Sequence, residues 1–499
     1  MNVTGVGVTS SLVVQSLGDM RSTLADLQRQ LGTGKKSTTY AGLGIDRGLA
    51  VGLRAKLAAI TGYSNSISQV GVRTSVQQTA LSQIVSLSST VKSATFSQKF
   101  DLDGSGQTST QRSAMAQLDH ILAALNTPAG DRYLFSGRAG DKPATDTLDH
   151  ILNGEGARAG LKQMIAERNQ ADLGSNGLGR LQIPAAAGSV VTIAEETPPT
   201  VFGMKLASVT PLNGATVTGP TGSPAGVTVN FTSNPNPGDA ITFAFNLPDG
   251  SKEELTLTAT VNSPPGPGEF TIDALPANTA ANFQAALSGS VQKLAATSLS
   301  AASTMAAANN FFNVDVGQPP MRVNGPPFDS ATSLIAGTPD NTVTWYTGEM
   351  GADLARGTAV AKVDDALTVS YGARANEQAI RATISNIAVY AVTTFSASAP
   401  NDKDRFTALS QRVGGGLSPQ NGQQKIQDIQ AELAFGQTTM NDAKERQQES
   451  KNMLETMLQG IEQAPQEEVA AQILMLQTRL QASLQTTAML YQLSIVNYL

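Results

Sequence analysis

The sequence contains no cysteine and only two histidines. Without thiolates the chain has no disulfide framework, no cysteine nucleophile and no zinc site built on sulfur. Aromatic residues make up 5% of the chain, with a single tryptophan, and charged residues make up 15%. With so few large and charged side chains, the protein is expected to pack through small residues in many weak contacts.

The chain also lacks the positive charge that nucleic-acid binding requires. Its net charge is −6 over 499 residues, and recognition of a phosphate backbone needs a basic surface, so nucleic acid is not an expected partner. The opening segment, MNVTGVGVTSSLVV, has no basic region ahead of a long apolar core, so no cleaved secretory signal is predicted. No membrane span is predicted either. By itself this pattern indicates a cytoplasmic protein, with leaderless export as the exception.

Both ends of the chain show helical periodicity. Residues 467–499 contain neither glycine nor proline, and apolar residues recur there at alternating steps of four and three, as they also do from Val13 to Leu31. This spacing is typical of a coiled-coil seam. Because a helix this apolar is not stable alone in water, we predict that the two ends pair and then pack against copies of the chain. Two ordinary core helices of a bundle are the alternative.

The residues predicted to form this subunit interface share the seam spacing or widen it. They are Leu17, Met20, Leu24, Leu27, Val469, Ile473, Leu476, Leu480, Leu484, Leu490, Tyr491 and Ile495.

Between the ends, the chain reads as helix, then strand, then helix. Near-heptad apolar spacing predicts a helix over 49–97, and a further helix is expected after a cap at Thr110. The stretch Val209–Leu275 is rich in valine, threonine, phenylalanine, glycine and proline and is predicted to form strands joined by turns. A helical patch is predicted over 277–310, and the whole β-rich insertion spans 184–372. A long helix is predicted over 419–463, ended by Pro465.

The predicted fold class is therefore mainly α. Long coiled-coil-like N- and C-terminal helices form a rod, and a β-rich α+β domain is inserted in the middle. The predicted divisions are an N-terminal coiled-coil segment 1–40, a helical rod in two halves 41–183 and 373–463, the insertion 184–372, and a C-terminal coiled-coil segment 464–499.

Two short segments resemble ligand loops. The run from Asp101 through Asp103 resembles the start of a calcium loop, but its twelfth position is Arg112 where a bidentate glutamate is needed, which favours a solvated turn. Gly32-Thr-Gly-Lys-Lys resembles part of a phosphate loop, but the first glycine of that pattern and the preceding strand are both missing.

Other reactive side chains lack the partners that chemistry would need. His120 and His150 have no zinc-binding motif around them, and Ser136 lies outside any nucleophile elbow. The pairs Asp364-Asp365 and Glu253-Glu254 have no neighbours in sequence that would shift a pKa. No catalytic, cofactor-binding or metal-binding residue is predicted, and the protein is not expected to be an enzyme.

Three segments carry a family resemblance. LGTGKK at 31–36 follows the N-terminal helix, GDRYLFSGR lies at 130–138, and the chain ends on LQTRLQASLQTTAMLYQLSIVNYL. In this order they resemble the bacterial flagellin family, which includes the hook–filament junction proteins, and most closely its alphaproteobacterial members. The resemblance covers 1–183 and 373–499.

The resemblance implies a structural, secreted subunit of the bacterial flagellum. Such a subunit polymerises through its paired terminal helices into the filament for swimming motility. Its implied partners are copies of itself, other flagellar axial proteins, an export chaperone and the type III export apparatus. Lys35-Lys36 and the Asn-Tyr-Leu ending depart from filament flagellins, so a junction protein stays open as an alternative. A secreted adhesive protein acting through the β-rich insertion is the alternative from another class.

Overall fold

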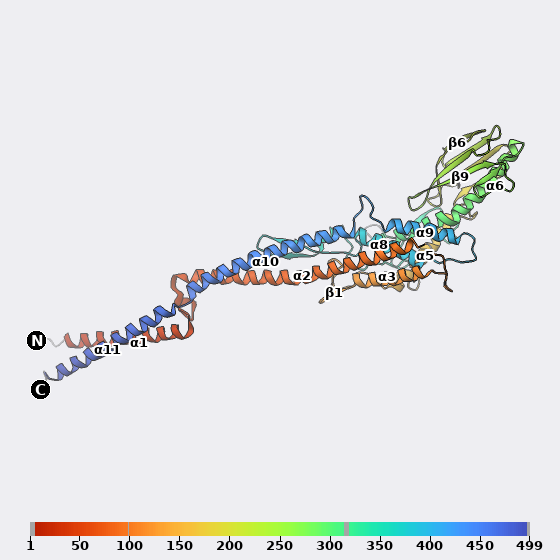
Figure 1. Ribbon diagram of the computed structural model, residues 1–499. Helices are drawn as coiled ribbons and strands as arrows, with labels where there is room; N and C mark the ends of the chain where they lie inside the picture. The colour runs from red at the N-terminus through yellow and green to blue at the C-terminus, as the bar shows by residue number, and fades with distance from the viewer. Residues whose placement is uncertain (1–4, 98, 314–318, 497–499) are drawn as a thin grey trace. The chain divides into compact units, whose positions relative to one another are not determined.

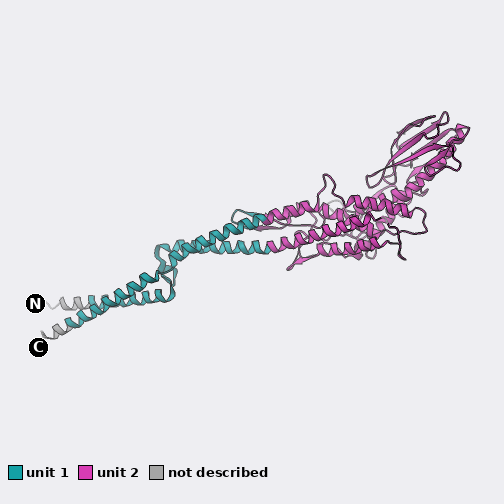
Figure 2. Ribbon diagram, in the orientation of Figure 1, with its two compact units in different colours: residues 1–69, 362–368, 438–499 teal, residues 70–361, 369–437 magenta. Residues whose placement is uncertain are grey.

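The computed structural model describes residues 5–97, 99–313 and 319–496, with side chains described from 12 to 489 (Figure 1). The chain divides into two compact units (Figure 2). Unit 1 consists of Met1–Gln69, Lys362–Thr368 and Thr438–Leu499, and unit 2 of Val70–Ala361 and Val369–Gln437. Each unit is therefore assembled from segments that are distant in the sequence.

Unit 1 is built from helices. Pro465 separates its last two helices, as predicted, because proline has no N–H to continue the hydrogen-bond ladder. The elements that contribute to this unit are α1 (Gly5–Thr33), the 3-10 turn η1 (Tyr40–Asp46), α2 (Arg47–Thr95), α10 (Ile426–Glu462) and α11 (Gln466–Val496), of which α2 and α10 also contribute to unit 2.

Unit 2 contains the remaining helices of the described chain. Helix α3 begins after Thr108, whose hydroxyl accepts the N–H of Gln111 while the Gln111 side chain accepts the N–H of Thr108. This capping box replaces the cap predicted at Thr110. The helices are α3 (Ser109–Leu125), α4 (Leu148–Asn153), α5 (Leu161–Leu173), α6 (Pro276–Leu294), which continues through the π-helical turn η2 (Ala295–Leu299) into α7 (Ser300–Phe312), α8 (Gln378–Val392) and α9 (Asp402–Gly416).

The strands form several small sheets. Among the described residues there are two four-stranded and three two-stranded sheets. The first four-stranded sheet has the order β3 (Leu181–Gln182), β4 (Val190–Glu195), β7 (Gly226–Phe231), β6 (Ala215–Thr221), and the second β10 (Glu269–Thr271), β9 (Lys252–Thr260), β8 (Ala240–Asn246), β5 (Lys205–Val209). The small sheets pair β1 (Pro128–Ala129) with β2 (Arg132–Tyr133), β11 (Met321–Val323) with β12 (Leu334–Ala336), and β13 (Val360–Lys362) with β14 (Thr368–Ser370). A further 3-10 turn, η3, spans Ala355–Thr358.

The two larger sheets share one core with α6. Apolar and polar residues alternate along β4, β7 and β8, so that one face of each strand is buried. Phe283 of α6 lies 5.2 Å from Phe270 and 5.4 Å from Phe231, measured between ring centroids, with the rings edge to face. Figure 1 shows α6 beside the two sheets, and it contacts β4 and β7 of the first and β9 and β10 of the second. Five phenylalanines, Phe231, Phe243, Phe245, Phe270 and Phe283, lie in this core.

The predicted fold class, a mainly α rod formed by terminal coiled-coil-like helices, is wrong. The chain is 52% helix and 16% strand, with the strands in several small sheets. Its long helices are α2 and α10, a central β region lies between them in sequence, and the terminal helices form no clear coiled-coil rod. Apolar periodicity records which side of a helix is covered, but not whether one long helix or several short segments cover it.

Helix α2 illustrates why the rod prediction fails. Gln77, on its buried side, donates from Nε2 to the carbonyl of Leu134 at 3.2 Å and to that of Tyr371 at 3.4 Å. Both partners lie outside any long helix. Gln77 occupies a seam position of the apolar spacing, but it forms hydrogen bonds with segments that lack regular secondary structure. A heptad pattern does not reveal such partners.

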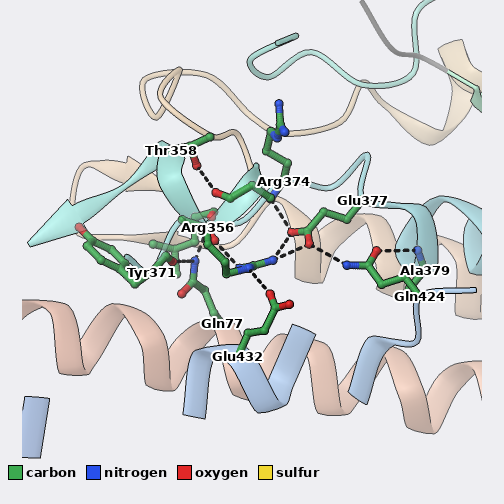
Figure 3. A network of polar contacts seen from close by, with 12 residues as sticks. Gln77, Arg356, Thr358, Tyr371, Arg374, Glu377, Ala379, Gln424 and Glu432 are labelled. Carbon is green, nitrogen blue, oxygen red and sulfur yellow. Dashed lines mark hydrogen bonds and ion pairs between the residues drawn. The ribbon is translucent and has the colours of Figure 1, made fainter. Parts of the chain in front are cut away.

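A buried polar network holds one of these segments (Figure 3). The guanidinium of Arg356 pairs with the carboxylate of Glu377, whose side chain is 8% exposed, and its Nε lies 3.0 Å from Glu432 on α10. Glu377 also accepts the backbone N–H of Arg374 at 3.1 Å and the amide of Gln424 at 3.4 Å. Because its members come from three stretches of unit 2, at 356, 374–377 and 424–432, the network ties the chain before α8 to α10.

Unit 2 also buries a tyrosine completely. The hydroxyl of Tyr346 donates to the carbonyl of Glu349 at 3.1 Å, and burial raises the pKa of Tyr346 above its ordinary value. Since the folded state disfavours the tyrosinate, this contribution to stability is complete below about pH 10 and is lost as the pH rises further.

We expect Tyr346→Phe to make unfolding less sensitive to alkali. The wild-type free energy of unfolding should fall above about pH 10 with a contribution from Tyr346 of up to about 1.4 kcal/mol per pH unit. Chemical denaturation at a series of pH values from 8 to 11 measures this slope. An unchanged slope in the variant would show that Tyr346 does not ionise on unfolding in this range.

Candidate subunit interface

Helices α1 and α11 pack against each other within unit 1 (Figure 1). Leu27 is buried together with Ala464, Val469 and Ile473. Leu24 and Leu476 are partly buried and pack against this cluster. Burial of a leucine or isoleucine side chain contributes roughly 1.5–3 kcal/mol, so the cluster stabilises the pairing of the two ends within one chain.

Backbone hydrogen bonds fix the inner end of this helix pair. The N–H of Lys36 donates to the carbonyl of Glu462 at 2.8 Å, and the N–H of Ala464 donates to the carbonyl of Gly34 at 3.0 Å. Arg54 on α2 forms two hydrogen bonds with the carboxylate of Glu462, at 2.9 and 2.7 Å. The antiparallel bridge of Lys35 and Gln463 sets the two helices antiparallel.

The structure places the predicted interface residues in three groups. Four are buried, four are half-buried, and Leu484 is exposed, while the side chains of Leu490, Tyr491 and Ile495 lie outside the described residues. The buried group is Leu27, Val469, Ile473 and Leu480, and the half-buried group is Leu17, Met20, Leu24 and Leu476. Contact of any of them with a second copy of the chain stays a prediction.

The outer side of α11 carries exposed apolar residues. Leu474 is 65% exposed, and Met475 and Met489 are also more than half exposed. At 100° per residue these three lie on the side of the helix opposite Leu476 and Leu480. Leu474 and Met475 are adjacent, and Met489 lies about four turns further along the helix. Exposed apolar residues on one side of a helix are what a partner surface would cover.

Helix α1 adds two exposed apolar residues that the sequence prediction did not single out, Leu12 and Val14, both more than half exposed. Leu31, the last residue of the predicted seam, is 40% exposed. Val14 lies next to the predicted seam residue Val13, off the four-and-three spacing, so a search along the seam alone passes over it. The run of three apolar residues at 12–14 is the sequence signal that could have identified Val14 as a candidate interface residue.

The other candidate reactive groups are used in local contacts. Asp103 accepts hydrogen bonds from Ser105 and Gln107 and lies 3.3 Å from Arg112, and these contacts lower its pKa, led by the Ser105 hydroxyl. His150 Nδ1 lies 3.0 Å from Asp146, and the buried hydroxyl of Ser136 donates to a backbone carbonyl. In the described ranges no three His, Asp or Glu side chains are grouped to hold a metal ion.

The paired carboxylates at 364–365 and 253–254 also have structural partners. Asp365 accepts the hydroxyl of Tyr63 at 2.7 Å, and Glu253 lies 3.0 Å from Arg412.

Of the helices in the described part of the chain, none combines the length and the hydrophobicity that crossing a membrane takes.

Comparison with known families and characterised proteins adds no relative: no family model matches the chain, and no curated protein is significantly similar to it. The geometry of unit 1 and the segments quoted above are therefore the basis for a functional proposal.

Proposed function

We propose that the protein is a structural subunit of the bacterial flagellum, a flagellin that assembles into the filament for swimming motility. One observation carries the proposal. The inner side of α11 is already covered by α1, yet its outer side exposes Leu474, Met475 and Met489. Between Val469 and Val496 the helix contains one charged residue, Arg479. A second copy of the chain would cover this surface.

The energetics favour assembly of many copies over a stable free subunit. Half-burying a leucine or methionine contributes roughly 1 kcal/mol, so one such contact is weak. A polymer repeats the contact on every subunit, and the entropy lost on ordering a subunit is offset by several neighbours. This suits a structural rather than an enzymatic role.

The same surface has consequences for the subunit before assembly. Exposed apolar helices associate without specificity, so an export chaperone that covers the C-terminal helix is part of the proposal. The subunit would pass through the flagellar export apparatus, contact the other axial proteins and reside outside the cell. A hook–filament junction protein is the alternative within the family.

A secreted adhesive protein is the second candidate, and the first four-stranded sheet favours it. Thr192, Thr228 and Thr218 lie side by side across β4, β7 and β6. Their side chains point away from the core, and the other outward-pointing residues of β4, β7 and β6 are also uncharged. Neutral hydroxyl groups on a regular surface are suited to hydrogen bonding with a glycan or another surface.

Electron microscopy after heat dissociation and salt-induced reassembly tests the proposal. The full chain should form long tubes, and a chain truncated before residue 467 should stay monomeric, because it lacks all of α11 except Gln466. Soluble monomers from both chains would favour the junction protein, which does not grow into a filament. Tubes from the truncated chain would contradict assembly through α11.

A deletion within unit 2 separates the polymer from the adhesin. A Cβ placed on Gly179 would lie 3.5 Å from that of Ala295, so a short Gly-Ser linker can replace 181–294 and remove both larger sheets. We expect the variant to assemble with roughly unchanged efficiency and any glycan binding to be lost. A wider deletion of 179–366 is unsuitable, because it removes α7, which packs on α5, α8 and α9.

Circular dichroism supplies the control for this deletion. The variant should keep the helical signal of the remaining helices. A folded variant that no longer assembles would place the assembly contacts in the deleted sheets and contradict the role proposed for α11.

A further inference from the structure

The turn between α1 and α2 is basic in an acidic protein. Residues 29–56 contain six lysines and arginines, namely Arg29, Lys35, Lys36, Arg47, Arg54 and Lys56, and one acidic residue, Asp46. The segment therefore carries a net charge of +5, whereas the whole chain carries −6. A local excess of positive charge raises the concentration of anions near this turn.

A cavity of about 360 Å³ lies at this turn, within unit 1. Lys35, Thr38 and Thr39 line it, and in the described part of the chain no hydrogen bond or ion pair engages their side-chain donors. Thr33 and Ser37 also line it, but their hydroxyls donate to the carbonyls of Arg29 and Thr39. The cavity therefore presents one ammonium and two hydroxyl groups that are available to a ligand.

The acceptor groups at the cavity are already occupied. Glu462 is the one carboxylate among its lining residues, and both of its oxygens accept hydrogen bonds from Arg54. The guanidinium of Arg54 lies 5.4 Å from the ring centroid of Tyr40, which holds it on the cavity wall. A ligand that satisfies this site must bring negative charge and several acceptor oxygens.

Two glycines shape the turn that carries these donors. Gly34 has φ +69°, a left-handed conformation that ends α1. A Cβ on Gly42 would lie 2.1 Å from the hydroxyl oxygen of Ser37, so only glycine fits there. The loop is thereby folded back on itself and brings Thr38 and Thr39 to the same cavity as Lys35.

We propose that this cavity binds a tetrahedral oxyanion of the phosphate class. The Lys35 ammonium pairs with its charge, and the Thr38 and Thr39 hydroxyls donate to its oxygens. The site is not a nucleotide loop, since α1 rather than a strand precedes it. Binding does not depend on the assembly role proposed for α11.

Calorimetric titration of the soluble full chain with inorganic phosphate, at constant ionic strength, tests the site. Binding should saturate at one phosphate per chain. Lys35→Gln should weaken it roughly tenfold or more, because a charge-assisted hydrogen bond is lost, and Thr38→Val should weaken it by a smaller factor. Lys444→Gln, which removes a charge on α10 away from the cavity lining, should leave affinity unchanged.

Three outcomes would overturn the assignment. The first is the absence of saturable binding in the wild-type chain. The second is binding that Lys35→Gln and Lys444→Gln weaken equally, which would reflect net charge alone. The third is competition by acetate that is as strong as competition by sulfate, because a carboxylate offers too few acceptors for three donors. Circular dichroism of each variant confirms that the helices are intact.

Discussion

Leu480→Asp should abolish assembly of the full chain. Leu480 is 8% exposed on the inner side of α11, so the variant places an unpaired carboxylate in an apolar contact, at a cost on the order of several kcal/mol. Helix α11 should then separate from α1 and no longer present its outer side in an ordered form. Sedimentation after salt-induced reassembly measures the loss, and unit 2 should keep its helical circular dichroism.

A companion variant separates folding of the subunit from contact between subunits. Leu474→Asp changes an exposed residue, so the isolated chain should unfold at an unchanged temperature while assembly falls steeply. Gln477→Glu adds a charge on another exposed side of the same helix and should assemble normally. If Leu474→Asp assembled as well as Gln477→Glu does, the outer side of α11 would not be the subunit contact.

Arg356→Ala should destabilise unit 2 by about 3–5 kcal/mol. The substitution leaves the carboxylate of Glu377, 8% exposed, without its ion-pair partner, and a buried charge without a partner is strongly unfavourable. It also removes the hydrogen bond to the carbonyl of Gly372. Guanidinium denaturation followed by circular dichroism measures the change in the free energy of unfolding.

The double variant Arg356→Met, Glu377→Gln identifies the origin of this effect. Both charges are removed and much of the volume is kept, so stability should return to within about 1–2 kcal/mol of wild type. Arg138→Ala is a suitable control, because its ion pairs with Glu349 and Asp353 involve an arginine side chain that is 54% exposed, and it should change stability little. A double variant as unstable as Arg356→Ala would assign the effect to lost packing rather than to charge.

Local elements were predictable where the chain carries its own signals. Pro248-Asp249-Gly250 lies in the segment predicted to form strands joined by turns, and it joins β8 to β9 with Gly250 at φ +84°. The break at Pro465 and the helices on either side of it followed from proline chemistry and apolar spacing. These signals act within a few residues, so no tertiary information is needed to read them.

The partners of each element were not predictable in the same way. Arg180 is almost fully buried with a positive φ of 67°, donates to the carbonyl of Ala331 at 2.8 Å, and pairs with Glu196 at 2.8 Å. An arginine between glycine and leucine in a turn-rich segment gives no sign of such burial. Its environment depends on residues up to 151 positions away.

The sequence by itself determined the apolar, almost uncharged character of α11, the basic turn at 29–56 and the alternation of the strands, because composition and periodicity are properties of neighbouring residues. Only the tertiary structure decided that short irregular segments cover α2, that Arg356 and Glu377 form a buried pair, and that Glu462 lines the same cavity as Lys35. The physical reason is that these contacts join residues whose separation along the chain carries no periodic signal.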